Sequence, residues 1–588
     1  MPLASSLAAA SPAAAPFVAR ADAPRRVRHL GTPIAARRAS SAPSAATTTR
    51  PGPTARSTLT SPSRVVRARS VSEPPAAPAE SDLAASAPAD GFDWHKAWYP
   101  MSPVDFLDPD APNAMKLLGA PLVAWRAENG AWSVVADSCP HRMAPLSLGF
   151  LSAERRLVCR YHGWEFGGDG AAKAIPMSVD AAAEKTACES SRSCATSYPC
   201  KEEAGVLWVW PTPGADAWLE ASQVPVATAA APLGELPGEW GMVELPVGYA
   251  PALENQFDPS HAEWLHAKYD PETGFLSDQN ANYEPMTAFE VVPGTMNAGG
   301  FTVKHGGYNA GNKDVSAERL FTAPCSSRSE YKDKNGKRYL SAAILYTPTE
   351  PGRCLMFTKF QAHQRSAVQG AGRAKVTTGD RVRALLTAPA EAAFRWYMEF
   401  QVSRPDLVRV GLVHGVYGNA AYTLGDQDIQ AMHGVEVAME AAEEDWKKAY
   451  YLPAPADVGV AGFRRWMDAH AGGGVRWARG VSDDASKVKP IEQQLDRYHR
   501  HTKHCRHCRE CLNELGALEA KLVDLTTGAC AASVLLGVGG AVVGQEAPAV
   551  VALGVAGLAT GAAERVRDMQ SEFLTSVKRR GDPIPKLW

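Results

Sequence analysis

The sequence predicts an α+β protein with a small all-β domain, a longer mixed domain and two apolar helices near the C-terminus. Three observations predict this fold: short β-rich runs between residues 91 and 215, helical and strand-like stretches from 240 to 500, and uncharged apolar segments within residues 525–563. With 588 residues, 45% of them hydrophobic, the chain can bury more than one core. Single cores stop growing at roughly 250–300 residues.

The N-terminal segment, residues 1–78, has the composition of a transit peptide and linker. Residues 1–72 carry eleven Arg and one acidic residue, Asp22, among many Ala, Ser, Thr and Pro residues. Plastid and mitochondrial transit peptides have this composition, although a disordered tail would share it. The formal net charge of −2 therefore leaves about −12 for the rest of the chain, which argues against nucleic-acid binding.

The all-β domain, expected over residues 91–215, contains the clearest metal-binding pattern. Asn129-Gly130 favours a hairpin turn, and the apolar run 206–210 predicts a strand. Between them lie a pair of cysteines and a pair of histidines, Cys139-x-His141 and, after 17 residues, Cys159-x-x-His162. Such a set can hold a [2Fe–2S] cluster with thiolates on one iron and imidazoles on the other. Zinc could use the same side chains, but its usual spacings differ, so the pattern favours a Rieske cluster.

The mixed domain, expected over residues 240–500, carries a second candidate metal site. Helices are expected near 388–402 and 427–449, and a strand over 339–347. Two His and one carboxylate, with open positions, hold Fe(II) in non-haem oxygenases. His261 and His266 are five residues apart, which on an ideal helix separates them by about 140°. The spacing alone therefore fits an ordinary surface helix, and only its position downstream of the Cys/His pattern favours iron.

These motifs resemble those of plastid Rieske non-haem iron oxygenases. Residues 139–147 (CPHRMAPLS) and 161–164 (YHGW) are similar to the Rieske domain of pheophorbide a oxygenase and its relatives, which include chlorophyllide a oxygenase and translocon-associated Rieske proteins. The run N-x-x-D-x-x-H-x-x-x-x-H over residues 255–266 is similar to the iron motif of Rieske oxygenases. The resemblance extends from about residue 93 to the C-terminus. It implies a Rieske domain joined to a helix-grip catalytic domain.

The same resemblance implies the ligands of the mononuclear iron. His261 and His266 would bind Fe(II), and Asp428 takes the position of the third ligand in the similar stretch 425–436. Asp426 and Glu436 stay open as alternatives, and these acids would also suit a solvated helix start.

Further roles follow from the resemblance alone. Asp258 would hydrogen-bond an iron-binding His and bridge toward the Rieske His162 of a neighbouring subunit in a homotrimer, and Asn255 would line the same pocket. Ferredoxin would donate electrons, and the substrate would be a chlorophyll-derived tetrapyrrole such as pheophorbide a or chlorophyllide a. The chain has no flavin or nicotinamide fingerprint, so a separate reductase is expected.

Residues 501–511 form a third motif rich in Cys and His. His501, Thr502, Cys505 and Cys508 match a C-terminal motif of the plastid relatives, and Cys511 is an addition. Flanking basic residues favour thiolates, so we expect Cys505 and Cys508 to be a redox-regulatory pair open to thioredoxin. A zinc site or inert thiols are the alternatives. The eleven cysteines do not have the pattern of a disulfide framework, which indicates a reducing compartment such as the plastid stroma.

The apolar segments 525–544 and 547–563 predict a transmembrane hairpin, followed by a tail over residues 564–588. A spanning helix needs about 20 residues, and the second segment is slightly shorter. A buried helical pair in a soluble domain is the alternative. Lys521, Arg565 and Arg567 flank the hairpin on one side, which predicts that both ends and the catalytic domains face the stroma, at the envelope or thylakoid membrane.

Two other functions compete with an oxygenase. One is a membrane-bound Rieske redox sensor or electron carrier of the chloroplast envelope, and the other is a zinc-bound structural protein. A pure carrier has no need of a second set of ligands such as His261, His266 and Asp428, so the sequence favours catalysis.

Overall fold

The computed structural model describes residues 91–227, 239–261, 265, 269–270, 275–276, 288–306, 315–363, 402, 404–412, 414, 419–483, 488–543 and 547–576. The predicted transit peptide over 1–78, nearly all of the helix expected near 388–402, and His266 lie outside these residues.

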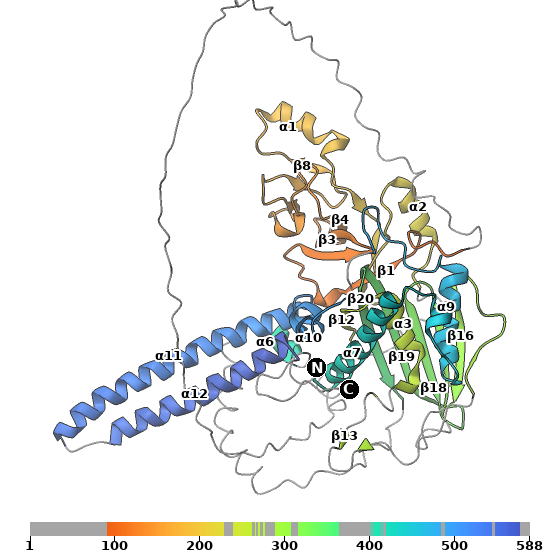
Figure 1. The fold of residues 1–588 in the computed structure, drawn as a ribbon. Coiled ribbons are helices and arrows are strands. Elements are labelled where there is room, and N and C mark those ends of the chain that lie inside the picture. The colour runs from red at the N-terminus through yellow and green to blue at the C-terminus, as the bar shows by residue number, and fades with distance from the viewer. Residues whose placement is uncertain are drawn as a thin grey trace, which may run out of the picture. The chain divides into compact units, whose positions relative to one another are not determined.

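The N-terminal domain is built from three small antiparallel sheets (Figure 1). The first has the order β1 (Tyr99–Pro103), β11 (Val206–Val209), β10 (Cys200–Glu203), and the second has the order β2 (Asn113–Leu117), β3 (Ala120–Arg126), β4 (Trp132–Ala136), β9 (Ser197–Tyr198). The third has the order β5 (Phe150–Leu151), β6 (Leu157–Val158), β7 (Glu165–Phe166), β8 (Ala172–Ala174). Two helices, α1 (Ala181–Cys188) and α2 (Ala215–Gln223), complete the domain.

Both local predictions for this domain are confirmed. Gly130 has a φ of 77° in the turn that joins β3 to β4, a conformation that glycine adopts without steric cost. All four residues of β11 are buried, as expected for the apolar run that pairs with a strand on each side.

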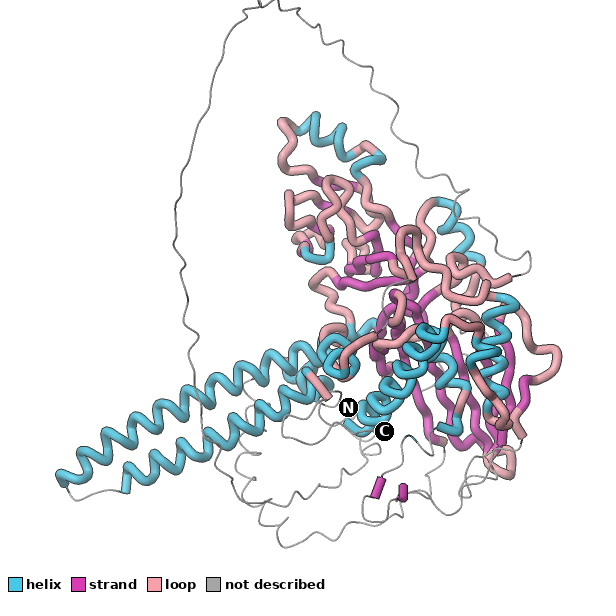
Figure 2. The backbone as a smooth tube through the Cα atoms, viewed as in Figure 1, coloured by secondary structure: helices cyan, strands magenta, loops and turns pink. Residues whose placement is uncertain are grey.

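The second domain is a seven-stranded antiparallel sheet with helices on one face, which confirms the predicted α+β class (Figure 2). The strand order is β12 (Gly241–Leu245), β20 (Arg353–Ala362), β19 (Arg338–Glu350), β18 (Ser326–Lys332), β17 (Ser316–Thr322), β16 (Gly300–Gly306), β15 (Glu290–Val291). Buried residues alternate along β17, the pattern of a strand with one face covered. The strand predicted over 339–347 lies inside β19.

Helices α3 (Tyr249–Phe257), α7 (Asn419–Ala442) and α9 (Asp457–His470) lie beside this sheet (Figure 1). Trp466 of α9 contacts Phe321 of β17 edge-to-face, with ring centroids 4.8 Å apart. Phe257 of α3 lies in the same aromatic cluster. The helix expected near 427–449 begins earlier, at Asn419, and is followed by the separate short helix α8 (Trp446–Ala449). The turn that follows α3 carries His261, and α7 carries Asp428.

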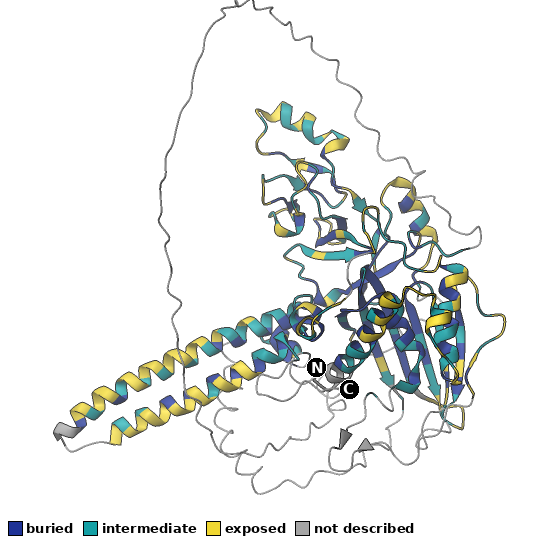
Figure 3. Ribbon diagram, in the orientation of Figure 1, coloured by how far each residue is buried: buried dark blue, intermediate teal, exposed yellow. Residues whose placement is uncertain are grey.

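Two long helices, α11 (Arg506–Val543) and α12 (Ala547–Leu574), pack antiparallel as a hairpin. Both helices are longer than the predicted apolar segments. Helix α11 begins inside the 501–511 motif, and α12 continues into the expected tail. Both are long and apolar enough to cross a membrane, judged by length and composition. Most of their apolar side chains are exposed, so the hairpin is not a core element of the described protein (Figure 3).

The base of the hairpin is fixed to the catalytic domain. The short π-helix η9 (Tyr498–Thr502) precedes α11, and the Thr502 hydroxyl donates to the Phe573 carbonyl at 2.6 Å. Arg497, which is 3% exposed, donates to the Glu572 carboxylate at 3.0 Å. On the other side, helix α6 (Pro405–Leu412) packs against α11. These contacts join four separate segments at one place.

Candidate metal centres

Two loops of the N-terminal domain present the predicted cluster ligands with the same backbone geometry. In each loop the amide four residues after the cysteine donates to the cysteine carbonyl, and the cysteine amide donates to the carbonyl five residues on, at 2.8–2.9 Å. The fourth residue, Met143 or Gly163, has a positive φ of 61° or 75°. Cys139 and Cys159 are therefore held in equivalent positions, as two loops that share one cluster require.

The side chains on these loops fit a [2Fe–2S] cluster. Cys139 and Cys159 are free, buried thiols, and the rings of His141 and His162 lie 4.6 Å apart between centroids. The indole of Trp164 stacks on His141 at 4.9 Å. Burial raises the pKa of Cys139 to about 11, so a bound metal would have to stabilise the thiolate. Desolvation, and then the charges of His141 and Arg142, lower the pKa of His162, which favours the neutral imidazole that ligates metal.

The second candidate centre joins the end of α3 to α7. His261 ends the short 3-10 turn η6 (Pro259–His261), and its Nε2 lies 3.4 Å from Oδ1 of Asp428 on α7. The Nδ1 atom of His261 contacts the backbone carbonyl of Asp258. A hydrogen on Nδ1 would leave Nε2 free to bind metal on the side of Asp428. The structure therefore brings together two of the three residues expected to bind iron, and the third, His266, lies outside the described residues.

Asp258 and Asn255, the two residues expected to lie around the iron ligands, make different contacts. The Asp258 carboxylate accepts a hydrogen bond from the Ser260 amide at 2.9 Å, and the backbone carbonyl of Asp258, rather than its carboxylate, contacts His261. Asn255 is half-buried on the last turn of α3, and its carbonyl accepts the Asp258 amide. Both residues lie beside the turn that carries His261.

The two alternative acids on α7 are engaged elsewhere. Asp426 pairs with Arg500, whose Nη1 lies 2.5 Å from Oδ1, and Arg497 lies 3.9 Å from Oδ2. Glu436 accepts the amide of Gly248 at 2.9 Å, at the start of α3. The carboxylate of Asp428 lies 3.4 Å from His261 Nε2, which favours Asp428 as the carboxylate ligand.

Comparison with known proteins shows a Rieske domain and similarity to plastid proteins. The family model described as Rieske [2Fe-2S] domain matches residues 97–187. The chain is 28% identical over 473 residues to the Arabidopsis thaliana protein named protochlorophyllide-dependent translocon component 52, chloroplastic, covering 74% of this chain and 76% of the relative. It is 28% identical over 451 residues to flavonoid 8-hydroxylase 2, chloroplastic, of Ocimum basilicum, covering 76% and 79%. It is 27% identical over 491 residues to pheophorbide a oxygenase, chloroplastic, of Oryza sativa subsp. japonica, covering 78% and 82%.

The chain contains a Rieske domain and is similar over about three quarters of its length to a plastid Rieske oxygenase. As a Rieske oxygenase, it is an enzyme that uses a [2Fe–2S] cluster and a mononuclear non-haem iron. The predicted cofactors are thereby confirmed.

Two arginines of this Rieske oxygenase hold α3, the helix that leads into the turn with His261, and the sequence pattern did not reveal either. Arg464 of α9 forms an ion pair with Glu254 of α3, which is 7% exposed. Arg319 of β17 donates to the Gln256 carbonyl at the end of α3 and, at 3.0 Å, to Nε2 of His305. Burial, and then the charge of Arg319, lower the pKa of His305 to about 4, so its imidazole is a neutral acceptor at physiological pH.

A third cluster of metal-binding side chains lies at the base of the hairpin of the Rieske oxygenase. His414, His501, Cys505 and Cys508 place one ligand atom each within 4.8 Å of the others. Burial opposes ionisation of Cys505, but hydrogen bonds with Cys508, His414 and His501 outweigh it and hold the pKa of Cys505 well below its usual range. The sequence motif contained three of these residues. Nothing in the sequence pointed to His414, since it lies far from the motif.

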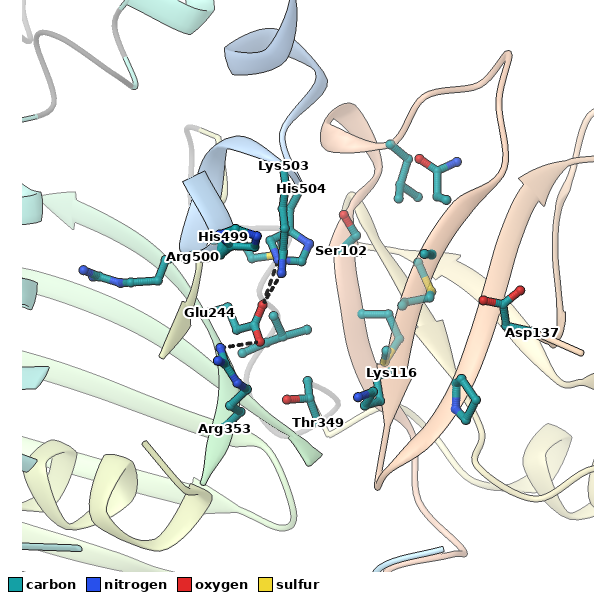
Figure 4. A pocket seen from close by; sticks show the side chains of 18 of the residues that line it. Ser102, Lys116, Asp137, Glu244, Thr349, Arg353, His499, Arg500, Lys503 and His504 are labelled. Carbon is teal, nitrogen blue, oxygen red and sulfur yellow. Dashed lines mark hydrogen bonds and ion pairs between the residues drawn. The ribbon is translucent and has the colours of Figure 1, made fainter. Parts of the chain in front are cut away.

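A cavity of about 1040 Å³ lies between β1 and β2 on one side and β12, β20 and η9 on the other (Figure 4). Glu244 forms ion pairs there with Arg353 at 3.3 Å and Lys503 at 3.2 Å, and His504 lies 2.9 Å away. Burial opposes its ionisation, but the His504 hydrogen bond and these charges lower the pKa of Glu244 to about 2. The cluster and iron ligands that the structure describes do not line this cavity, which is therefore distinct from the two candidate metal centres.

Proposed function

We propose that this Rieske oxygenase uses electrons from ferredoxin and dioxygen to oxidise a chlorophyll-derived tetrapyrrole, with pheophorbide a as the first candidate. The observation that carries the proposal is the 3.4 Å approach of His261 to Asp428 in a chain similar to a pheophorbide a oxygenase. A redox carrier would need only the first centre, so a second set of ligands favours catalysis.

The protein's own residues have separate tasks in this reaction. The Asp258 carbonyl orients the His261 ring so that Nε2 faces Asp428, and these two residues would hold the iron, with Asp428 supplying negative charge. The bound iron supplies dioxygen activation, with electrons that come from the cluster. His141 and Tyr161 are exposed, so the cluster end of the domain is open to a redox partner.

A homotrimer would bring that exposed end of one subunit to the iron of the next. Met143 is 81% exposed and Tyr161 57% exposed on the cluster loops, so large apolar side chains surround the histidines. In this arrangement Asp258 would lie toward His162 of the neighbouring subunit. Analytical ultracentrifugation of the detergent-solubilised protein should give a trimer, and Met143→Asp should dissociate it. A monomer at all concentrations would exclude this part of the proposal.

The hairpin α11–α12 would anchor the enzyme in a chloroplast envelope or thylakoid membrane, with both ends in the stroma. A membrane anchor suits a large apolar ring, which partitions into the bilayer. The basic residues Lys521, Arg565 and Arg567 lie within α11 and α12, just beyond the apolar segments 525–544 and 547–563 and on the side of the catalytic domain.

The test is oxygen incorporation by purified full-length protein with reduced ferredoxin and labelled dioxygen. The panel contains pheophorbide a, protochlorophyllide a, chlorophyllide a and phyllobilins, with mass spectrometry of each product. A flavone is included, because the chain is similarly related to a flavonoid 8-hydroxylase. We expect label in a tetrapyrrole and none with His261→Ala.

Two outcomes would replace the proposal. Label in the flavone alone would make the enzyme a flavonoid hydroxylase. If no compound gains label while ferredoxin reduces the cluster and oxygen reoxidises it, the protein is a Rieske redox carrier, a function in keeping with its similarity to a translocon component.

A further inference from the structure

We infer that His414, His501, Cys505 and Cys508 form a structural zinc site that fastens the hairpin to the catalytic domain. Two thiols and two imidazoles are a common ligand set for structural zinc. The site is separate from both centres of the oxygenase reaction and does not depend on the substrate. It offers an alternative to the redox-regulatory thiol pair expected from the sequence.

The distances between ligand atoms fit a single tetrahedral ion. With zinc bonds of about 2.3 Å to sulfur and about 2.0–2.1 Å to nitrogen, sulfur and nitrogen atoms on one zinc lie about 3.6 Å apart. The Cys505 sulfur lies 3.7 Å from His414 Nδ1, and the Cys508 sulfur lies 3.2 Å from His501 Nε2. All four atoms lie within 4.8 Å of one another. One metal ion could therefore contact all of them with small side-chain adjustments.

The same distances argue against a second cluster of Rieske type. In such a cluster the thiolates bind one iron and the imidazoles bind the other, so sulfur and nitrogen lie at opposite ends. Here each sulfur is paired with a nitrogen at 3.2 or 3.7 Å, which is the arrangement around one ion.

The outer nitrogen of His501 has a hydrogen-bond partner of the kind found behind zinc ligands, and the outer nitrogen of His414 lies on the side of a carboxylate. His501 Nδ1 lies 2.7 Å from the Met242 carbonyl, which favours a hydrogen on Nδ1 and leaves Nε2 free for metal. His414 Nε2 lies 3.9 Å from the Glu239 carboxylate. A ligating His commonly donates its other N–H to a carbonyl or carboxylate. These contacts are independent of the thiols and point to the same ligand geometry.

Burial makes the cluster better suited to a structural metal than to thiol exchange. Cys505 and Cys508 are 0% exposed and His501 is 5% exposed. A disulfide reductase would have to reach sulfurs that lie inside the core at the base of the hairpin. Structural zinc sites, in contrast, are closed to solvent.

The fold around the cluster brings distant segments together at close range. His414 follows α6, His501 lies in η9, and the two cysteines lie at the start of α11. A Cβ atom at Gly411 would lie 2.6 Å from Cys511 Cβ and 2.4 Å from the His507 carbonyl, so only glycine allows α6 to approach α11 this closely. One ion would thus join His414, which follows α6, to residues 501–508 at the base of the hairpin.

The decisive variant is His414→Ala, because a thiol pair would not need this residue. Full-length protein is purified in detergent and dialysed against a competing chelator, and zinc and iron per chain are measured by elemental analysis. We expect about one zinc per chain in the wild-type protein. In His414→Ala the zinc affinity should fall at least about 10-fold, because loss of a residue that only hydrogen-bonds a metal ligand already lowers affinity by that factor. The matched control is His499→Ala, an exposed histidine of η9, which should keep its zinc.

Two further variants separate loss of the zinc ligand from misfolding and from zinc bound at the Rieske site. His414→Cys should retain zinc, with X-ray absorption showing a change from two to three sulfur neighbours, even if His414→Ala folds poorly. Cys139→Ser should keep its zinc, which excludes zinc misplaced in the Rieske site. The inference is overturned if the wild-type protein with filled clusters holds less than about 0.1 zinc per chain, or if peptide mapping without reductant finds a Cys505–Cys508 disulfide. Zinc that survives in His414→Ala would overturn it as well.

Discussion

The three candidate acids of α7, Asp426, Asp428 and Glu436, allow iron binding and stability to be separated by single substitutions. Asp428 approaches His261 at 3.4 Å, whereas Asp426 lies two residues away and pairs with Arg500, which is 2% exposed. We predict that Asp428→Asn loses the mononuclear iron and keeps its stability. Asp426→Asn, the matched control on the same helix, should keep the iron and lose stability.

The structure gives the size of each effect. Removing the Asp426 charge leaves Arg500 buried without its closest counterion, and breaking a buried pair in this way costs about 3–5 kcal/mol. Asn at position 428 keeps the shape and one oxygen of Asp, so the iron-free protein should lose less than about 1 kcal/mol. The affinity for Fe(II) should fall by more than about 10–100-fold. A loss of that size is typical when only a residue that hydrogen-bonds a metal ligand is changed, and Asp428 is expected to bind the metal itself.

The assay counts iron per chain and measures local opening by hydrogen exchange. The wild-type protein should hold about three irons, two in the cluster and one mononuclear, and Asp428→Asn about two, with an unchanged electron paramagnetic resonance signal from the reduced cluster. Hydrogen exchange in α7 should accelerate in Asp426→Asn only. The reasoning is refuted if Asp428→Asn retains three irons while Asp426→Asn or Glu436→Gln loses one.

Three other outcomes are expected. His261→Ala should abolish turnover and leave the cluster spectrum intact, and loss of that spectrum would contradict two separate centres. The folded pKa of Glu244, about 2, lies below its ordinary 4.5, so its stabilisation, about 3 kcal/mol, is present above pH 4.5 and lost as pH falls toward 2. Glu244→Gln should therefore speed hydrogen exchange in β12 and η9 at pH 7 and weaken its acid dependence, and equal acid dependence in both proteins would exclude this role. Alkaline carbonate should leave the mature protein in chloroplast membranes, and its release would exclude the hairpin anchor.

The sequence predicted best what is encoded locally. The cluster ligands lie on two loops, and each loop is closed by hydrogen bonds within six residues, so their spacing is visible in the chain. The hairpin at Gly130 and the buried strand β11 have equally local signals, a positive φ and an unbroken apolar run. The domain order and the apolar helices followed from the same kind of pattern.

Residues that meet only through tertiary structure could not be found in this way. Asp428 was proposed by resemblance, and its neighbours Asp426 and Glu436 could be set aside only after their partners Arg500 and Gly248 were seen. His414 had no signal, because its relation to Cys505 depends on how α6 packs against α11. The lengths of α11 and α12 were also underestimated, since their polar ends lack the apolar run that marked the rest.

The helices that carry His261 and Asp428 are held by contacts that do not require iron. Glu254 and Arg464 join α3 to α9, and Arg500 joins α7 to η9 through Asp426. The Asp426–Arg500 pair is buried, and the Glu254 carboxylate of the other pair is buried, so both contacts would be costly to break. The iron-free protein should therefore keep both ligands near their final positions, so that binding pays little for reorganisation. For the same reason, loss of iron in Asp428→Asn would report on the ligand itself, because the surrounding helices stay in place.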